Sequence, residues 1–281
     1  MPMERHEQTN SIKKMDYRNM KGIFLAAALA AVFTTGCRAQ QPASTAKIQI
    51  WDTRNHPEDY YLQDGQQPSS VALLPAPPEP GSLLFLYDEA RYKWGKQQRN
   101  TPRGAQAVAD ARLNGEDLSR AFSEAFGCTI SRETTPELYR LMQNMREDAG
   151  DLGTREAKRY YMRVRPYVFY GDTTSVRSQE ESHRHSGSYP SGHTAMGWAE
   201  ALVLAEINVD RQDEILKRGY EIGQSRVIAG YHWQSDVDAA RLMGSAVVAR
   251  LHADSKFQAQ LEKAKKEFAR LKKAGKIAPK N

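Results

Sequence analysis

Cysteine is scarce in this chain of 281 residues, which has only Cys37 and Cys128. Two cysteines cannot build a disulfide framework, so the core has to stabilise the folded protein. Cys128 stands in an apolar stretch without a histidine or carboxylate patterned beside it. This context indicates a small buried side chain and not a reactive thiol.

Long apolar runs are missing after the N-terminus, which argues against a polytopic membrane protein. The run from Ile23 to Phe33 follows Lys21 and is too short to span a bilayer stably, so residues 1–37 are expected to be a secretory signal peptide. The small residues ending at Cys37 resemble a bacterial lipoprotein box, which predicts lipidation of this cysteine; cleavage after Ala39 is the alternative. Either way we expect export, to the periplasm or to a lipid anchor at the bacterial envelope.

A strong excess of charge of one sign is also missing. The net charge is +6 and falls to about +4 without residues 1–36, which carry five Lys or Arg and three Asp or Glu. Much of the remaining charge lies in the Lys-rich amphipathic stretch 256–280, with a basic tail predicted at 276–281. Because aromatic residues do not alternate with these cations, we expect a solvated helix face and no nucleic-acid partner.

Helical periodicity covers nearly all of the chain from residue 81 onward, and no convincing strand alternation appears. The fold class is therefore predicted to be all-α, as a single-domain helical bundle over residues 71–275, after a polar tether or disordered arm at 38–70. The segment 170–189 has no apolar period and is expected to be a surface loop. Helices are predicted at 83–99, 101–112, 116–126, 136–149, 154–165, 191–207, 212–229, 235–252 and 255–273.

Three short strings suggest phosphate chemistry. Lys158 and Arg165 are seven residues apart, so a helix would place them on one face within reach of a common anion. Pro190-Ser191-Gly192-His193 stands where a loop becomes a helix, whose first N–H groups can also bind an anion. Each string by itself is also explained by a solvated charge pair or a helix cap.

The third string contains Arg226, His232 and Asp236. Spacing of four residues lets one helical turn carry the histidine and the carboxylate, so that the carboxylate fixes the imidazole tautomer and leaves the other nitrogen as a nucleophile. A surface ion pair is the alternative for this string alone.

Together the order K-x6-R-P, P-S-G-H and S-R-x5-H-x3-D resembles the signature of the type 2 phosphatidic-acid phosphatase superfamily, which is related to vanadate haloperoxidases. Further runs, among them the one from Gly230 to Ala240, resemble the class A bacterial nonspecific acid phosphatases. The similarity extends over about residues 72–272.

The resemblance implies a role for each matching position. His232 would become the phosphohistidine, Asp236 would orient it, and His193 would protonate the leaving alcohol and later activate water. The phosphoryl oxygens would be held by Lys158, Arg165, Ser191, Gly192 and Arg226. It also implies phosphomonoester substrates of broad range, no metal, no cofactor, and a homodimer.

The chain departs from that family at two positions. Many members have a cysteine where Ala229 stands and another that aligns near Thr174. Their loss implies a missing disulfide and predicts a more mobile loop over residues 173–186. In that loop His183 and His185 could form a metal pair, but without further ligands nearby a solvated loop is favoured.

Two other functions remain open on the sequence. A vanadate-dependent haloperoxidase would use a closely similar oxyanion site, and bromide oxidation by peroxide would identify it. A phosphate-binding surface lipoprotein without turnover would need neither the acid nor the nucleophile. A p-nitrophenyl phosphate assay with EDTA at mildly acidic pH separates this binder from a phosphatase.

Overall fold

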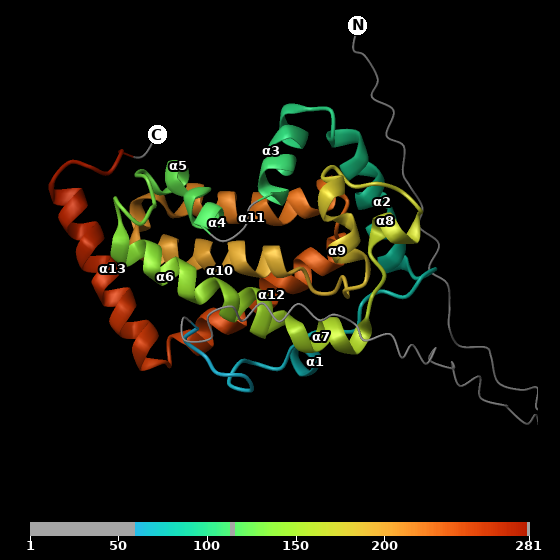
Figure 1. Cartoon of the computed structure of the whole chain (residues 1–281), viewed down its shortest axis with the longest axis horizontal. Helices are drawn as coiled ribbons and strands as arrows, with labels where there is room; N and C mark the ends of the chain where they lie inside the picture. Colours follow the sequence, from blue (N-terminus) through green and yellow to red (C-terminus); the bar gives the residue numbers. More distant parts are fainter. Residues whose placement is uncertain (1–59, 113–115, 280–281) are drawn as a thin grey trace, which may run out of the picture. The chain divides into compact units, whose positions relative to one another are not determined.

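The computed structural model describes residues 60–112 and 116–279, in which helices are present and strands are absent (Figure 1). The predicted all-α class is confirmed. The longer helices are α2 (Leu83–Gln98), α3 (Pro102–Ala111), α6 (Pro136–Glu147), α7 (Gly153–Tyr161), α10 (Gly192–Ile207), α11 (Gln212–Ala229), α12 (Gln234–Leu251) and α13 (Ser255–Lys273). Between them lie α1 (Ser70–Leu73), α4 (Glu116–Arg120), α5 (Ser123–Phe126), the π-helical turn η2 (Asp148–Leu152), α8 (Pro166–Phe169), η3 (Arg177–Gln179), α9 (Glu180–Arg184) and η4 (Val209–Arg211).

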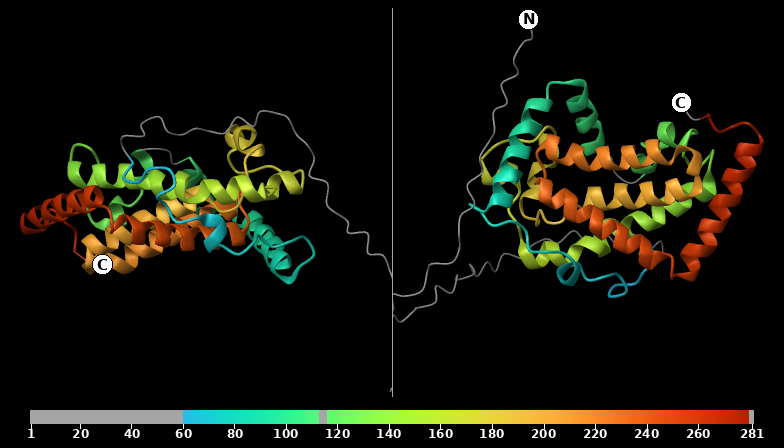
Figure 2. Two further views of the ribbon diagram at one scale, coloured as in Figure 1. Left: turned by 90° about the horizontal axis from the view of Figure 1, so that it is seen from below. Right: turned by 180° about the vertical axis from the view of Figure 1, so that it is seen from behind.

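α10 is the central helix. Ten of its sixteen residues are buried, so it is covered on more than one face. It packs against α11 and α12, and the three helices lie next to one another in Figure 1 and in the right-hand view of Figure 2. The candidate phosphate-binding strings at the start of α10, the end of α11 and the start of α12 are thereby brought to one end of the bundle.

Glycines let these three helices approach closely. A Cβ on Gly219 would lie 2.4 Å from Cβ of Ala201, and one on Gly244 would lie 2.8 Å from the carbonyl oxygen of Ala195. Both contacts are shorter than a side chain tolerates in a close-packed interior. The sequence thus specifies tight contacts of α10 with α11 through Gly219 and with α12 through Gly244.

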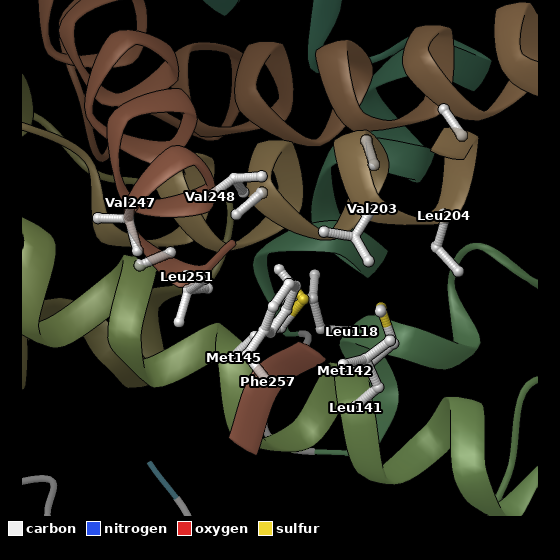
Figure 3. Close-up of a cluster of buried hydrophobic side chains, with 14 of the residues drawn as sticks. Leu118, Leu141, Met142, Met145, Val203, Leu204, Val247, Val248, Leu251 and Phe257 are labelled. Atoms are coloured by element: carbon white, nitrogen blue, oxygen red, sulfur yellow. The ribbon is translucent and has the colours of Figure 1, made fainter. Parts of the chain in front are cut away.

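The hydrophobic core continues from α10 to α6, η2 and α13 (Figure 3). Phe257 and Leu261 of α13 are buried against it, as the amphipathic pattern predicted. The segment after α13 is not a free basic tail, because the N–H of Ala278 donates to Gly127 O (2.8 Å) and Arg211 donates to Pro279 O (2.5 Å). Residues up to 279 therefore belong to the packed domain.

The chain before α1 also packs against the helices. Tyr61 and Leu62 are buried, and their N–H groups both donate to the Asp148 carboxylate at 3.0 Å. We call residues 60–75 the N-terminal strap. Residues 60–70 are thus part of the domain and not of the predicted tether, because apolar side chains and backbone donors both find partners. The predicted signal peptide, Cys37 and residues 38–59 lie outside the described residues.

The segment 170–189 is less irregular than predicted, since it contains η3 and α9. It lies beside the end of α11, where the N–H of Ser175 donates to Ala229 O at 2.9 Å. The Thr174 hydroxyl contacts Tyr231 Oη (3.2 Å) and Glu180 Oε1 (3.0 Å). Hydrogen bonds thus occupy the place inferred for the missing disulfide, and the greater mobility of this segment stays a prediction.

Cys128 is half-buried against the core, and burial raises the pKa of its thiol to about 11. This agrees with an inert small side chain. Among the described residues, the helices are all too short or too polar to cross a membrane.

Candidate active site

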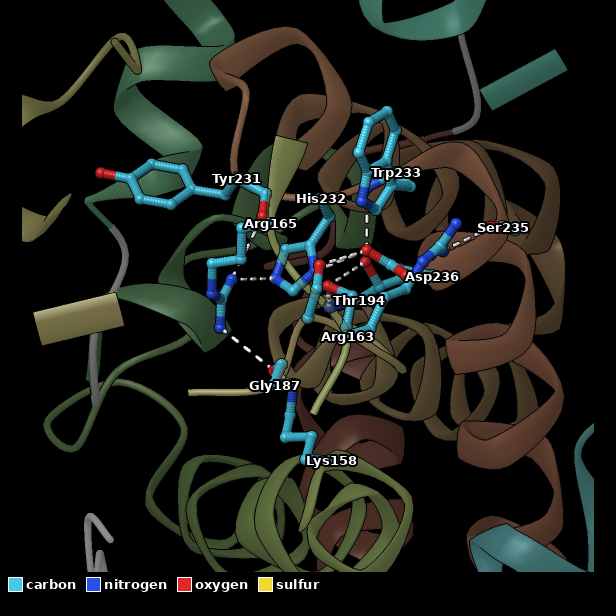
Figure 4. A network of polar contacts seen from close by, with 12 residues as sticks. Lys158, Arg163, Arg165, Gly187, Thr194, Tyr231, His232, Trp233, Ser235 and Asp236 are labelled. Atoms are coloured by element: carbon cyan, nitrogen blue, oxygen red, sulfur yellow. Dashed lines mark hydrogen bonds and ion pairs between the residues drawn. The ribbon is translucent and has the colours of Figure 1, made fainter. Parts of the chain in front are cut away.

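Lys158 and Arg165 reach the site from two different segments. α7 ends before Met162, which has a left-handed φ of 42° and donates its N–H to Lys158 O (3.1 Å). Arg165 follows with extended backbone, φ −71° and ψ 149°. The prediction that one helix carries both cations is therefore wrong. They still converge, because Lys158 Nζ and Arg165 Nη2 lie 3.3 and 3.4 Å from the carbonyl oxygen of Gly187 (Figure 4).

The start of α10 presents backbone donors. Ser191 caps the helix, with its Oγ accepting an N–H of the first turn at 3.4 Å. A Cβ on Gly192 would lie 3.1 Å from Gly150 O and 3.9 Å from Lys158 Cε, so glycine permits this close approach. His193 is the second residue of the helix and is partly exposed. The first N–H groups of a helix lack intrahelical partners and favour an anion.

Arg226 lies in the last turn of α11 and is fully buried. Its guanidinium carbon is 4.4 Å from the ring centroid of Tyr231. Among the described residues, its three side-chain nitrogens have no hydrogen-bond partner. A buried cation whose donors are unmatched is costly, and a guanidinium fork fits the oxygens of a phosphate. Arg226 thus points to an anion as the missing partner.

His232 and Asp236 lie on either side of the start of α12. Trp233 is the N-cap, so His232 precedes the helix and Asp236 lies in its first turn. The expected shared helical turn is therefore wrong, but the two buried side chains do meet, with Nδ1 and Oδ2 3.4 Å apart. The same Oδ2 accepts the N–H of Trp233 at 2.8 Å, a capping contact that fixes the carboxylate.

Arg165 determines the tautomer of His232. Its Nη1 lies 3.1 Å from His232 Nε2, and a guanidinium only donates, so Nε2 carries the lone pair. The proton is then on Nδ1, which faces Asp236 Oδ2 and, at 3.3 Å, Ser188 Oγ. Ser188 also donates to Asp236 Oδ2. Nε2 is therefore the nitrogen that can bond to an electrophile.

The electrostatics of the site favour an anion. Burial lowers the pKa of Lys158 to about 7, and repulsion from Arg165 adds to this effect. Burial likewise lowers the pKa of Arg165 and of Arg226 to about 10 each. Burial, together with Arg165 and Lys158, lowers the pKa of His232 well below its usual range. A multiply charged anion would relieve the repulsion between the three cations.

His183 is nearer to this site than the sequence predicted. It lies in α9, where its carbonyl accepts from Arg165 Nε (2.9 Å) and its ring packs 5.2 Å from that of Tyr231. Burial, followed by the charge of Arg165, lowers its pKa to about 3. The predicted solvated loop is thus wrong for His183, whereas His185 is exposed. In the described part of the chain, groups of three or more His, Cys, Asp or Glu arranged to hold a metal ion are absent.

Three residues on the side of Asp236 away from His232 were not predicted from the sequence: Arg163, Asp88 and Ser235. Arg163 Nη1 lies 2.6 Å from Asp236 Oδ1, and its Nη2 lies 2.7 Å from Asp88 Oδ2. Ser235 contacts both Arg163 and Asp88. In Figure 4 Arg165 lies on one side of the His232 imidazole, and Asp236 and Arg163 lie on the other.

Comparison with known proteins agrees with this geometry. Residues 149–258, which include all eight candidate residues, match the PAP2 superfamily. A non-specific acid phosphatase of Providencia stuartii is 55% identical over 245 residues, which cover 87% of this chain and 99% of that protein. A non-specific acid phosphatase of Salmonella typhimurium is 43% identical over 71% of this chain and 80% of its own length. An acid phosphatase of Zymomonas mobilis is 36% identical over 69% and 74%.

Proposed function

The chain belongs to the PAP2 superfamily and, within it, to the class A bacterial non-specific acid phosphatases, and from this premise we propose that it works through a phosphohistidine. In this proposal the enzyme is exported, needs no metal, and hydrolyses a broad range of phosphomonoesters. One observation carries the mechanism: His232 Nε2 lies 3.1 Å from Arg165 Nη1, a group that only donates, and the lowered pKa of His232 reflects the charges of Arg165, Lys158 and Arg226.

The first step transfers the phosphoryl group to His232. Nε2 forms a bond to phosphorus while the bond from phosphorus to the ester oxygen breaks, and His193 gives its proton to the leaving alcohol. The proton on Nδ1 stays between Asp236 and Ser188, whose oxygens stabilise the positive imidazole. In the second step His193 takes a proton from water, the water oxygen bonds to phosphorus, and the P–N bond breaks to release phosphate.

The cations supply most of the stabilisation in this proposal. Negative charge spreads over the equatorial oxygens as phosphorus is transferred, and preorganised donors act there without reorganisation. Arg226 and Arg165 each provide a guanidinium fork, and Lys158 provides a point charge. The Ser191-Gly192 turn provides the first backbone N–H groups of α10.

An acidic, bell-shaped pH profile follows from the pKa values. His232 must be neutral to attack, and its lowered pKa keeps it so into the acidic range. His193 must carry a proton at the same time. Lys158, with a pKa of about 7, loses its charge as the pH rises through neutrality, which weakens phosphate binding. We therefore expect kcat/KM to fall above about pH 7, and Lys158→Arg to move this alkaline limb upward.

The decisive test traps the intermediate. Wild-type protein quenched during turnover of labelled p-nitrophenyl phosphate in EDTA should carry an acid-labile, base-stable label. His232→Ala should lose both the label and about 10³-fold or more of the activity. An unchanged rate in His232→Ala would refute the route.

His193→Ala gives a second, directional result. Because p-nitrophenolate leaves without a proton, the label should still form from p-nitrophenyl phosphate and accumulate. With an alkyl phosphate, whose leaving oxygen needs the proton, labelling should slow by about 10²- to 10⁴-fold. Equal slowing with both substrates would contradict the role of general acid. Bromide oxidation on adding vanadate and peroxide would instead favour the haloperoxidase reading, and phosphate binding without turnover the binder.

Export and assembly are separate proposals that rest on the sequence. The run from Ile23 to Phe33 supports a signal peptide, and Cys37 supports a lipid anchor at the bacterial envelope; without lipidation the protein would be released into the periplasm. Labelled palmitate should appear in the wild-type protein and be lost in Cys37→Ala, with activity then recovered in the soluble fraction. Light scattering of the purified protein should give the mass of a homodimer.

A further inference from the structure

The two carboxylate oxygens of Asp236 have different partners. Oδ2 faces Nδ1 of His232 and accepts hydrogen bonds from the Ser188 hydroxyl and from the N–H of Trp233. Oδ1 receives Nη1 of Arg163 at 2.6 Å. Since Asp236 is fully buried, these contacts determine the plane in which the carboxylate lies. The orientation of His232 thus depends on the far partner, Arg163, as well as on the near ones.

Arg163 is itself held on several sides. Its Nη2 donates to Asp88 Oδ2 at 2.7 Å, and its Nη1 also donates to Ser235 Oγ at 2.7 Å. Asp88 is fully buried in α2 and accepts the backbone N–H of Ser235 at 2.8 Å. The guanidinium carbon lies 5.4 Å from the ring centroid of Trp233. A guanidinium fork bound by two carboxylates has little freedom to rotate.

We propose that Arg163, held by Asp88, is a positioning residue that fixes the Asp236 carboxylate against His232 and sets the charge next to the nucleophile. The proposal rests on the proposed phosphohistidine route. The order Asp88, Arg163, Asp236, His232 alternates in charge, with one cation between two carboxylates. α2, the segment after α7, and the start of α12 each supply one charged member.

Removal of Arg163 and removal of Asp88 should shift the pKa of His232 in opposite directions. Without the Arg163 cation, the Asp236 carboxylate is less neutralised, which favours the imidazolium and raises the His232 pKa. Without the Asp88 anion, the Arg163 cation is less neutralised, which disfavours the imidazolium and lowers that pKa further. A group that serves packing alone gives no such pair of opposite shifts.

The test measures pH profiles and single-turnover labelling in Arg163→Met, Arg163→Lys and Asp88→Asn. Arg163→Met should lower kcat about 10- to 100-fold, with KM changed less, and move the acidic limb of kcat/KM up by about half a pH unit or more. Asp88→Asn should move that limb down. Arg163→Lys keeps the charge without the fork, so the limb should stay in place while kcat falls less than in Arg163→Met.

Arg211→Met is the matched control. Arg211 is also a buried arginine that donates to backbone carbonyls, but about 22 Å of helix separate it from Arg226. The Arg211→Met variant should have a lower unfolding midpoint than wild type, but the acidic limb of its kcat/KM profile should not move. If Arg163→Met does not fold, the other two variants still test the proposal. The acidic limb of kcat/KM should then stay in place in Arg163→Lys and move to lower pH in Asp88→Asn.

The proposal is overturned if the limbs of Arg163→Met and Asp88→Asn stay at the wild-type position or move together. This outcome differs from failure of the phosphohistidine route, since wild type would then carry no acid-labile label at all. A labelled wild type with unshifted variants rejects the positioning role only.

Discussion

Arg226 combines a cost for folding with a benefit for binding. Its guanidinium is fully buried without a hydrogen-bond partner among the described residues, and burial lowers its pKa to about 10. Burying an unmatched cation opposes folding, and a bound phosphate supplies the missing acceptors. Stability and anion binding are therefore in conflict at this residue.

Replacing Arg226 with methionine should expose this conflict. We expect the free energy of unfolding without phosphate to rise by about 1–3 kcal/mol, because the unmatched charge is gone. Activity should fall by about 10²- to 10³-fold, as when one transition-state donor is lost. Urea unfolding with and without phosphate measures the first effect, and phosphate should stabilise the wild type more than the variant. A variant less stable than wild type in phosphate-free buffer would contradict the interpretation.

Residues of the site were predictable where they share a short string. His232 and Asp236 stand four apart, and Gly192 sits beside a capping serine, so chemistry and spacing can be read together. Asp88 and Arg163 are 75 residues apart, and they meet because α2 packs against the start of α12, where Asp88 accepts the N–H of Ser235. The spacing of residues along the chain does not predict a contact between two such distant positions.

At the scale of elements, the sequence predicts a helix best where it carries its own stop signal. α11 ends at Ala229 as predicted, because Gly230 takes a φ of 91° and caps it. α7 was predicted four residues too long, since Met162 is not a residue type expected to adopt a left-handed φ. In the short α9 the His183 ring packs 5.2 Å from that of Tyr231, a contact that no apolar period reveals.

The first residues of the N-terminal strap are bound by the carboxylate of Asp148. Asp148 accepts two backbone N–H groups, and its place in η2 puts the strap next to the segment that packs on α10. Asp148→Asn offers one oxygen in place of two, so one of these donors is left facing an NH2 group.

We expect Asp148→Asn to cost about 1–3 kcal/mol of stability and to speed hydrogen exchange at Tyr61 and Leu62. Glu156→Gln, which perturbs the exposed contacts of Ser69, is the matched control and should leave those two amides protected. Unchanged exchange at Tyr61 in Asp148→Asn would show that burial alone holds the strap.

For the whole molecule, buried carboxyl groups link stability to pH. Glu200 is fully buried in α10 with Ser119 Oγ 3.2 Å from Oε1, and burial raises its pKa to about 8. Burial raises the pKa of Asp148 to about 7. Between their unfolded and folded pKa values these groups bind more protons in the folded state, so their contribution to stability falls as the pH rises. His183, with its lowered pKa, has the opposite effect below about pH 6.5.

Glu200→Gln should remove one part of this dependence. Between pH 6 and 8 the stability of wild type relative to the variant should fall by about 1 kcal/mol per pH unit, measured by urea unfolding. Because every other titrating group is shared, the difference between the two curves isolates Glu200. Parallel curves would mean that this carboxyl group is not protonated in the folded protein.

Trp233 gives the molecule an optical consequence. Its indole lies next to His232 in the chain, donates through Nε1 to Val164 O at 2.8 Å, and has the Arg163 cation 5.4 Å from its ring centroid. Phe85 packs against the same ring, which is 1% exposed and so shielded from solvent quenchers. Any rearrangement of charge at His232 changes the electric field across this indole. Its emission can therefore report each catalytic cycle without an added dye.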